Sequence, residues 1–274
     1  MIEVKNIVKS FEGKTILHDI SATFYAGKTN LIIGQSGSGK TVLMKSIVGL
    51  IRPESGQVLY NGKDLLKMNS SEVRTLRSEI GMLFQGSALF DSLTVLENVM
   101  FPLKMFTRQS MVERVKRAEF CLERVNIKGV NNLYPSEISG GMQKRVAIAR
   151  AIALNPKYLF CDEPNSGLDP RTSIVIDELV SDITKEYNMT TIINTHDMNS
   201  VMGIGENIVF LNKGYKEWVG TKEEIFTAKN EALDDFVFAS NLFKMVKKYV
   251  VKENLESFFD NKSGKFNIQL FNHL

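Results

Sequence analysis

A glycine-rich octapeptide, GQSGSGKT at residues 34–41, constrains this chain more than any other feature of its sequence. It satisfies the pattern G-x-x-x-x-G-K-[ST] through Gly34, Gly39, Lys40 and Thr41. An apolar run, NLII, precedes it, and TVLMKSIVGL follows it with helical character. A strand, a glycine loop and a helix in this order predict a cradle for nucleotide phosphates. A chance match in a chain of this length is on the order of a 1% event.

Each residue of this glycine loop (residues 34–41) has a chemical task in such a site. The glycines let backbone N–H groups wrap the phosphate oxygens. The Lys40 ammonium would neutralise the β- and γ-phosphate oxygens, and the Thr41 hydroxyl would bind Mg²⁺. The residues expected to hold the nucleotide here are Gly34, Ser36, Gly37, Ser38, Gly39, Lys40 and Thr41.

A pair of acids in YLFCDEP, residues 158–164, predicts the other half of the site. An apolar strand delivers Asp162 at its carboxyl end, where the ligands of parallel sheets collect. We expect Asp162 to hold Mg²⁺, usually through water, and Glu163 to act on the attacking water as general base. Paired acids can also form a solvated cap, but the four apolar residues before them favour the site. Cys161 is interpreted as buried filler without chemistry.

Short apolar runs alternate with helical patterns, which is typical of an α/β fold. Strands are expected at 2–8, twice within 15–34, and at 79–84, 157–162, 190–197 and 207–212. Asn61-Gly62 is a hairpin signal. Between residues 84 and 157 the sequence pattern becomes helical. This part contains a capping-box pattern at Thr94 and Glu97 and apolar residues at helical spacing over 111–125. The expected fold is a P-loop NTPase core with a mostly parallel sheet, an N-terminal antiparallel β part and an inserted helical subdomain at about 86–155.

Composition excludes several classes of protein. No apolar run approaches the roughly 20 residues that span a bilayer, and the N-terminus is unlike a secretory signal. Two cysteines, Cys121 and Cys161, fit a reducing compartment. A net charge of +3 is too slight to argue for nucleic acid. We expect a soluble cytoplasmic protein that does not bind nucleic acid.

The motifs together resemble an ATP-binding subunit of an ABC transporter. The glycine loop is followed by SGGMQ at 139–143, DEP at 162–164, SGLD at 166–169 and NTHD at 194–197, in the order and spacing of that family. The likeness covers about residues 1–240 and is far more specific than any one motif. It implies an ATPase that uses ATP and Mg²⁺.

The resemblance implies roles for the matching positions. Phe11 corresponds to the aromatic residue that stacks on adenine, with a hairpin core position as the rival interpretation. Gln85 matches the Q-loop residue, which reaches Mg²⁺ and joins the core to the helical insert. Asp169 belongs to the D-loop, and His196 matches the switch histidine that contacts the γ-phosphate. Asn194-Thr195 replaces the commoner pair of residues before His196, and we expect little consequence.

The signature motif at 139–141 implies a second copy of the chain as partner. In this family Ser139, Gly140 and Gly141 close over the γ-phosphate held by the other protomer, so each ATP is sandwiched between two chains. Ile138 and Met142 replace the usual leucine and glutamine, but neither supplies the groups that touch phosphate. Activity is therefore expected to survive these departures.

The segment at 82–103, MLFQGSALFDSLTVLENVMFPL, is similar to the Q-loop region of ATPases from Mce-type phospholipid transporters, the maintenance-of-lipid-asymmetry kind. YPSEISGGMQKRVAIARAIALNP at 134–156 resembles the same subfamily. This implies a peripheral motor on the cytoplasmic face of the inner (plasma) membrane, with permease subunits and a lipid-binding Mce-type subunit as partners. A few apolar residues after Gln85, Met105 among them, should receive a permease helix. The alternatives are an ABC ATPase for another solute or, less favoured, a soluble non-transport ABC ATPase.

Other nucleotide-binding classes fit less well. A GTPase would need Asn-Lys-x-Asp, and NKGY at 212–215 lacks the aspartate. A non-transport ABC ATPase would usually carry two cassettes or a long coiled-coil insertion, and a regulatory module would be expected to lack Lys40 or Glu163. The expected division is an ABC ATP-binding domain at 1–240 and a partly helical tail at 241–274. The tail lysines are interpreted as a solvated face, and the partner protomer as a source of cover for its apolar side.

Overall fold

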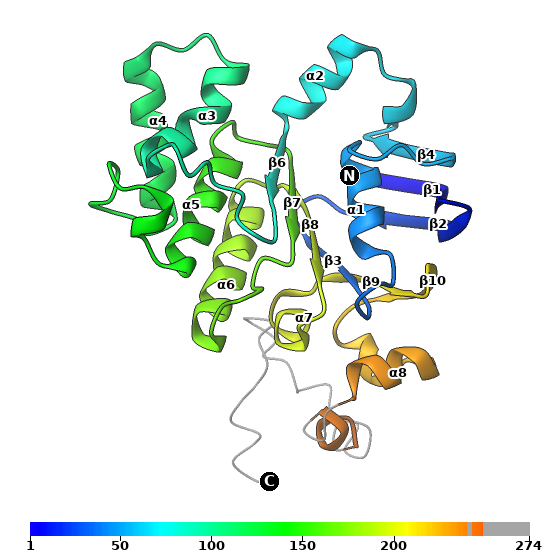
Figure 1. Cartoon of the computed structure of the whole chain (residues 1–274). Helices are drawn as coiled ribbons and strands as arrows, with labels where there is room; N and C mark the ends of the chain where they lie inside the picture. Colours follow the sequence, from blue (N-terminus) through cyan, green and yellow to red (C-terminus); the bar gives the residue numbers. More distant parts are fainter. Residues whose placement is uncertain (240–242, 249–274) are drawn as a thin grey trace.

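Two β-sheets organise the computed structural model, which describes residues 1–239 and 243–248 (Figure 1). The smaller sheet is antiparallel, in the order β2-β1-β4-β5, and comprises β1 (Ile2–Phe11), β2 (Lys14–Phe24), β4 (Ser55–Tyr60) and β5 (Lys63–Asp64). The larger sheet has the order β10-β9-β3-β8-β7-β6. Its strands are β3 (Thr29–Ile33), β6 (Ile80–Leu83), β7 (Tyr158–Asp162), β8 (Thr190–Thr195), β9 (Asn207–Asn212) and β10 (Tyr215–Gly220). All neighbours in it are parallel except β9 and β10.

Eight α-helices surround the sheets in the described residues. They are α1 (Lys40–Val48), α2 (Ser70–Ser78), α3 (Val95–Phe106), α4 (Met111–Arg124), α5 (Gly140–Ile152), α6 (Pro170–Glu186), α7 (Met198–Ile204) and α8 (Glu231–Val237). Short 3-10 turns lie at Leu65–Lys67, Pro135–Glu137 and Glu224–Thr227, and residues 243–248 are helical. Within this described part of the chain, no helix has the length and apolar character to cross a membrane.

The larger sheet separates two hydrophobic clusters, because successive residues of a strand point to opposite faces. Leu31 and Ile33 of β3 belong to the cluster that contains helices α3 to α7. Ile32, between them, belongs to the cluster that contains α1 and the antiparallel sheet. Figure 1 shows the same division, with α3 to α6 on one side of strands β6 to β8 and α1 on the other. The α/β fold predicted from the sequence is confirmed.

Local signals explain several elements. Asn61 and Gly62 both have positive φ, 48° and 84°, and join β4 to β5 in the hairpin that their sequence predicts. The Thr94 hydroxyl and the Glu97 carboxylate form a reciprocal capping box at the start of α3. α1 ends at Gly49, whose φ of 78° is favourable for glycine. The predictions of the hairpin and of the capping box are confirmed.

Other expectations need more than local signals. The strand expected at 79–84 is β6, which lies at the edge of the larger sheet, so its Ile80 and Met82 are only half-buried. The division of the chain at 86–155 stays a prediction, since α3, α4 and α5 share one hydrophobic cluster with the sheet. The tail prediction lies outside the described residues except at 243–248, where Val246 is buried by its own chain.

Candidate nucleotide site

The glycine loop connects β3 to α1, and two of its glycines are sterically required. A Cβ on Gly34 would lie 2.1 Å from the Leu211 carbonyl oxygen, which no side chain can accommodate. Gly39 caps α1 in the left-handed region, at φ 104°, where a Cβ would lie 2.8 Å from Leu17 Cδ2. The loop therefore holds a tight path that leaves the N-terminal N–H groups of α1 available to an anion.

Lys40 places a buried cation inside this loop. Its side chain is 5% exposed, and Nζ donates hydrogen bonds to the carbonyl oxygens of Gly34 (2.8 Å) and Gln35 (3.1 Å). Burial lowers the pKa of Lys40, while Glu163 and Asp162 act in the opposite direction. A phosphate beside the ammonium would relieve the cost of burying this charge. This electrostatic environment fits a polyphosphate ligand.

A second observation supports the same fit. The hydroxyl of Ser38 is buried and has no hydrogen-bond partner within 1–239 and 243–248. Buried polar atoms are normally paired, so an unpaired one in a glycine loop is available to a bound phosphate oxygen. The loop residues present here therefore suit the nucleotide that their pattern predicts.

The carboxyl end of β7 brings Asp162 to the loop. The Thr41 hydroxyl donates to Asp162 Oδ1 at 3.3 Å, and the side-chain amide of Asn194 donates to the same oxygen at 3.0 Å. Asn194 is in register with Asp162 on the neighbouring strand β8. Asn194, for which we expected little consequence, therefore contacts the carboxylate predicted to hold Mg²⁺. A hydroxyl and a carboxylate side by side are oxygen ligands that Mg²⁺ prefers.

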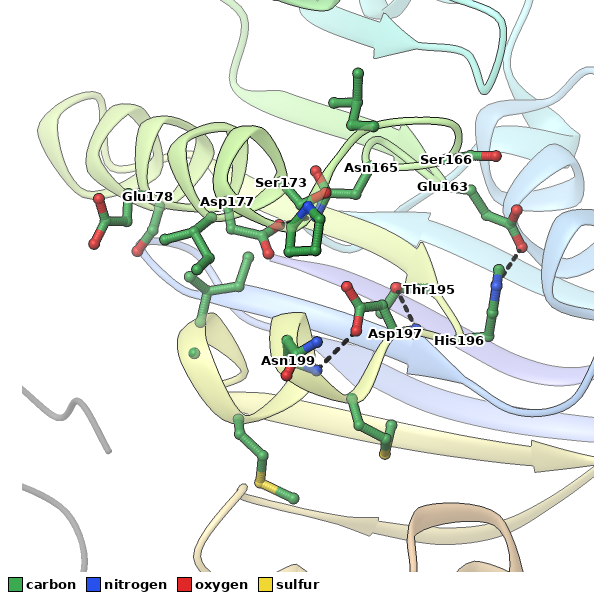
Figure 2. Close-up of a pocket in the computed structure, with 18 of the residues that line it drawn as sticks. Glu163, Asn165, Ser166, Ser173, Asp177, Glu178, Thr195, His196, Asp197 and Asn199 are labelled. Carbon is green, nitrogen blue, oxygen red and sulfur yellow. Dashed lines mark hydrogen bonds and ion pairs between the residues drawn. The ribbon is translucent and has the colours of Figure 1, made fainter. Parts of the chain in front are cut away.

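Glu163 receives two side chains from distant parts of the chain. Gln85 Nε2 donates to Glu163 Oε2 at 3.0 Å, and His196 Nδ1 lies 3.0 Å from Glu163 Oε1. Figure 2 shows Glu163 and His196 pointing toward each other from the ends of their strands. Gln85 Nε2 also donates to the Ser166 hydroxyl at 3.3 Å. The fold thus gathers Gln85, Glu163 and His196, which are far apart in sequence.

Basic residues of α5 hold the segment after β6, and the sequence interpretation missed them. The buried Lys144 ammonium donates to the carbonyl oxygen of Gln85. Arg150 donates to the carbonyl oxygens of Ser87 (2.8 Å) and Ala88 (2.7 Å). A signal existed, because Lys144 precedes the buried Ile148 by four residues and so lies on the apolar face of the helix.

The helix that follows the signature motif lies on the opposite face of the larger sheet from the helix that follows the glycine loop (Figure 1). Ser139 caps α5, with its hydroxyl accepting from the Met142 N–H at 3.3 Å. A Cβ on Gly141 would lie 2.8 Å from Thr172 Cγ2, so the motif packs beside the start of α6. The helix α5 thus packs in one hydrophobic cluster with α3, α4 and α6, whereas α1, which follows the glycine loop, packs in the other.

Asp169 caps the helix beside the signature motif. Its Oδ1 accepts from the N–H groups of Arg171 and Thr172, both at 3.0 Å, and its Oδ2 accepts from the Thr172 hydroxyl at 2.5 Å. Hydrogen bonding from Thr172 lowers the pKa of Asp169. The carboxylate therefore stays charged at the N-terminus of α6.

Phe11, at the end of β1, is 43% exposed, with Lys9 Nζ 5.0 Å from its ring centroid. This exposure is unlike a hairpin core position. A ring with a free face at the edge of the antiparallel sheet can stack on a planar base.

Comparison with known proteins places these features in a family. A family model described as ABC transporter matches residues 17–166, which is more than half of the chain. The probable ribonucleotide transport ATP-binding protein Mkl of Mycobacterium leprae is 36% identical over 236 residues, covering 86% of this chain and 68% of that protein. The methionine import ATP-binding protein MetN of Clostridioides difficile is 40% identical over 233 residues, covering 85% and 72%.

Solved structures of a bacterial ABC transporter cassette are similar in fold. Its dimeric structure has a TM-score of 0.75 at 34% identity, covering 81% of this chain and 99% of the cassette. A dimeric post-hydrolysis state of the same cassette, bound to ADP and phosphate, has a TM-score of 0.74. With the glycine loop, the acid pair and the signature motif in place, the chain belongs to the ABC transporter family and is an ATP-binding ATPase of that family.

Proposed function

We propose that this chain is the motor subunit of a membrane ABC transporter that moves phospholipid, with ATP hydrolysed between two copies of the chain. The observation that carries the hydrolytic part is the convergence of Gln85 and His196 on the two oxygens of Glu163. A carboxylate held from both sides at a strand end, beside a phosphate loop, is arranged to act on a water molecule.

In this mechanism the side chains divide the work. Lys40 and the N–H groups of the glycine loop bind and orient the phosphates of ATP. Glu163 accepts the proton of the attacking water as general base, while Gln85 and His196 fix the orientation of its carboxylate. Thr41, Asp162 and Gln85 are the residues that would hold Mg²⁺, which would neutralise charge on the β- and γ-phosphates.

The dimer is proposed from the separation of the two anion-binding motifs. Ser139, Gly140 and Gly141 lie beside α6 rather than at their own glycine loop, so the motif is free to close over a nucleotide held by the partner. A two-fold axis then pairs each loop with the other chain's motif and completes two sites. Loss of the γ-phosphate would remove the charge that holds the chains together. Phe11 stacking on adenine and Asp169 at the dimer face complete the proposed site.

Phospholipid is proposed as the substrate because of the segment at 82–103. Its likeness to Mce-type ATPases covers the part of the chain that runs from β6 past Gln85 into α3. Phe90 (41% exposed) and Met105 (55% exposed) of this region have apolar surface available for a permease helix. The proposed location is the cytoplasmic face of the inner membrane, with permease subunits and a lipid-binding Mce-type subunit as partners.

Another solute is the second candidate. The relatives that cover most of this chain are named for methionine import and ribonucleotide transport, and neither name mentions lipid. The motor assignment is the same in both cases, because the nucleotide site does not contact the transported molecule.

Reconstitution separates the two candidates. The chain is co-purified with its membrane subunits from solubilised membranes, placed in vesicles, and given ATP with fluorescent phospholipid or with methionine. ATP-dependent movement of phospholipid, abolished by Lys40→Ala, is the expected result. Movement of the water-soluble solute and none of phospholipid would refute the lipid assignment. Met105→Glu should uncouple ATP hydrolysis from transport while ATP binding persists, and a similar change at the exposed Val112 on α4 serves as its control.

A further inference from the structure

One side chain joins the loop that carries the proposed catalytic group to two helices. Asn165, two residues after Glu163, donates from Nδ2 to Asp177 Oδ1 at 2.8 Å and to the Ser200 hydroxyl at 3.1 Å. Asp177 lies on α6, two turns after the cap residue Asp169. The hydrogen bond between Asn165 and Ser200 therefore joins α7 to the segment that follows β7.

The elements that Asn165 joins carry or adjoin the groups that the mechanism uses. The loop of Asn165 carries Glu163, and α7 follows directly after His196. Figure 2 shows Asn165 and Asp177 on the α6 side of a pocket of about 1290 Å³ whose lining also includes Glu163 and His196. A shift of this network therefore changes the distance between Glu163 and His196.

The negative charge of Asp177 fixes the orientation of the Asn165 side-chain amide. A carboxylate is only an acceptor, so it selects the orientation in which the amide N–H groups point to α6 and α7. In the opposite orientation Asn165 Oδ1 would face the carboxylate and the hydrogen bond would be lost. Asn165 Oδ1 is buried, with no hydrogen-bond partner in the described part of the chain, so nothing there competes for the orientation. Asp177 is 6% exposed and has no role in phosphate binding or proton transfer.

We propose that Asp177 is a positioning residue for ATP hydrolysis, which acts by holding Asn165 so that the loops bearing Glu163 and His196 keep their catalytic spacing. The inference rests on the proposed role of Glu163. It concerns the rate of hydrolysis rather than the affinity for ATP, because the hydrogen bonds of Asn165 lead to α6 and α7 and not to the glycine loop.

The burial of Asp177 also affects its protonation. Burial raises the pKa of Asp177 to about 6; hydrogen bonds from Ser200 and Asn165 oppose this, and the charges of Asp197 and Glu178 add to it. Since the folded pKa is raised, the carboxylate binds its proton more tightly in the folded state. Stability therefore falls as pH rises from about 4 to about 6, and is lowest where the side chain is charged.

The Cys161 thiol of β7 is also close enough to Asp177 to interact electrostatically; burial raises its own pKa, so it stays neutral. The charged form of Asp177 is therefore less favourable in the folded protein than the protonated form.

The first test replaces Asp177 by leucine and compares it with Asp182→Leu, the same change at an exposed position of the same helix. In the protein with its dimer partner, Asp177→Leu is expected to lower kcat about tenfold or more, since small misplacements of catalytic groups have large effects. The KM for ATP should stay within about threefold. A kcat equal to that of Asp182→Leu would overturn the proposal.

A second set of variants keeps the test decisive if the leucine variant does not fold. Asn165→Asp places two carboxylates at hydrogen-bond distance, and kcat should fall at least about tenfold. The double variant Asn165→Asp with Asp177→Asn exchanges acceptor and donor, and should recover kcat to within about threefold of the wild type. Lack of recovery, with both proteins folded, would contradict the positioning role.

Glu163→Gln is measured in the same series to keep the two hypotheses apart. If Glu163→Gln still turns over ATP, the site assignment fails whatever Asp177 does. If Glu163→Gln is inactive and Asp177→Leu is normal, the assignment of Glu163 stands and only the role of Asp177 is refuted.

Discussion

At the scale of single residues, the role of Glu163 as general base can be tested most directly. Glu163→Gln is expected to retain ATP binding and to lose turnover by about 10²–10⁴-fold, because an amide cannot accept the proton of the attacking water. The ATP-bound dimer should also persist longer. Hydrolysis of labelled ATP and equilibrium nucleotide binding measure the two effects, with Glu231→Gln on α8 as the matched control. Turnover close to that of the wild type would remove Glu163 from this role.

The burial of the two cysteines predicts that their thiols react slowly. Burial raises the pKa of Cys121 to about 11 and also raises that of Cys161. At pH 8 only about a thousandth of the Cys121 side chains is then thiolate, which is the nucleophilic form. Neither thiol should react with a maleimide in the folded protein, and both should react after unfolding in guanidinium. Mass spectrometry of the native sample provides the measurement, and rapid labelling of either residue would contradict the buried positions.

At the scale of elements, α5 links the signature motif to the segment that carries Gln85. Its first turn begins after Ser139, and its buried face holds the carbonyl oxygen of Gln85 through Lys144. Burial lowers the pKa of Lys144, with Cys161 and Glu163 acting in the opposite direction. One helix thus begins at the motif proposed to contact the partner's nucleotide and also holds the backbone of Gln85, whose side chain donates to Glu163.

Breaking this link should slow hydrolysis without loss of nucleotide. Lys144→Met keeps the length of the side chain but removes the hydrogen bond, so Gln85 is expected to lose its fixed position. The predicted result is a kcat lowered by about tenfold with an unchanged Kd for ATP. Arg145→Met is the control, since Arg145 on the same helix donates to the Asn126 carbonyl oxygen instead. Equal rates for the two variants would show that the lysine contact is irrelevant to turnover.

The elements also show what could be predicted from sequence. The hairpin at Asn61-Gly62 and the capping box of Thr94 depend on contacts within a few residues, so both could be predicted from the sequence. The same capping signal at Asn69 and Glu72 starts α2 and was overlooked. The glycine loop and the acid pair were predicted because their chemistry is contiguous in the chain.

The contacts missed from the sequence share a cause. Asn194 reaches Asp162 because β8 lies beside β7, and Asp177 reaches Asn165 because α6 packs beside the loop that precedes it. Sheet order and helix packing decide these pairs, and no local pattern encodes either. Lys144 was recognisable as a lysine on an apolar face, but its acceptor depended on the path of a loop nearly sixty residues away.

At the scale of the whole molecule, the proposed sandwich predicts complementation between inactive chains. Lys40→Ala should prevent ATP binding, and Ser139→Arg should block closure over the partner's ATP. A mixed dimer has one doubly damaged site and one intact composite site. With random pairing, the mixture should recover about a quarter of wild-type hydrolysis, since half of the dimers are mixed and each has one working site. Absence of recovery, with mixed dimers demonstrated by differential tagging, would argue against a signature motif that serves the other chain.

The order of the larger sheet also has a consequence for biosynthesis. β3 leaves the ribosome early, yet its neighbours are β8 and β9, which end at residues 195 and 212. At roughly 5–20 residues per second, β3 waits on the order of ten seconds with both of its edges unpaired. Unpaired apolar edges are where nascent chains aggregate. The translation speed of residues 34–189 therefore sets how long β3, the strand before the glycine loop, depends on chaperones. Slowly translated codons in that stretch should lower the yield of active protein while leaving its amino-acid sequence unchanged.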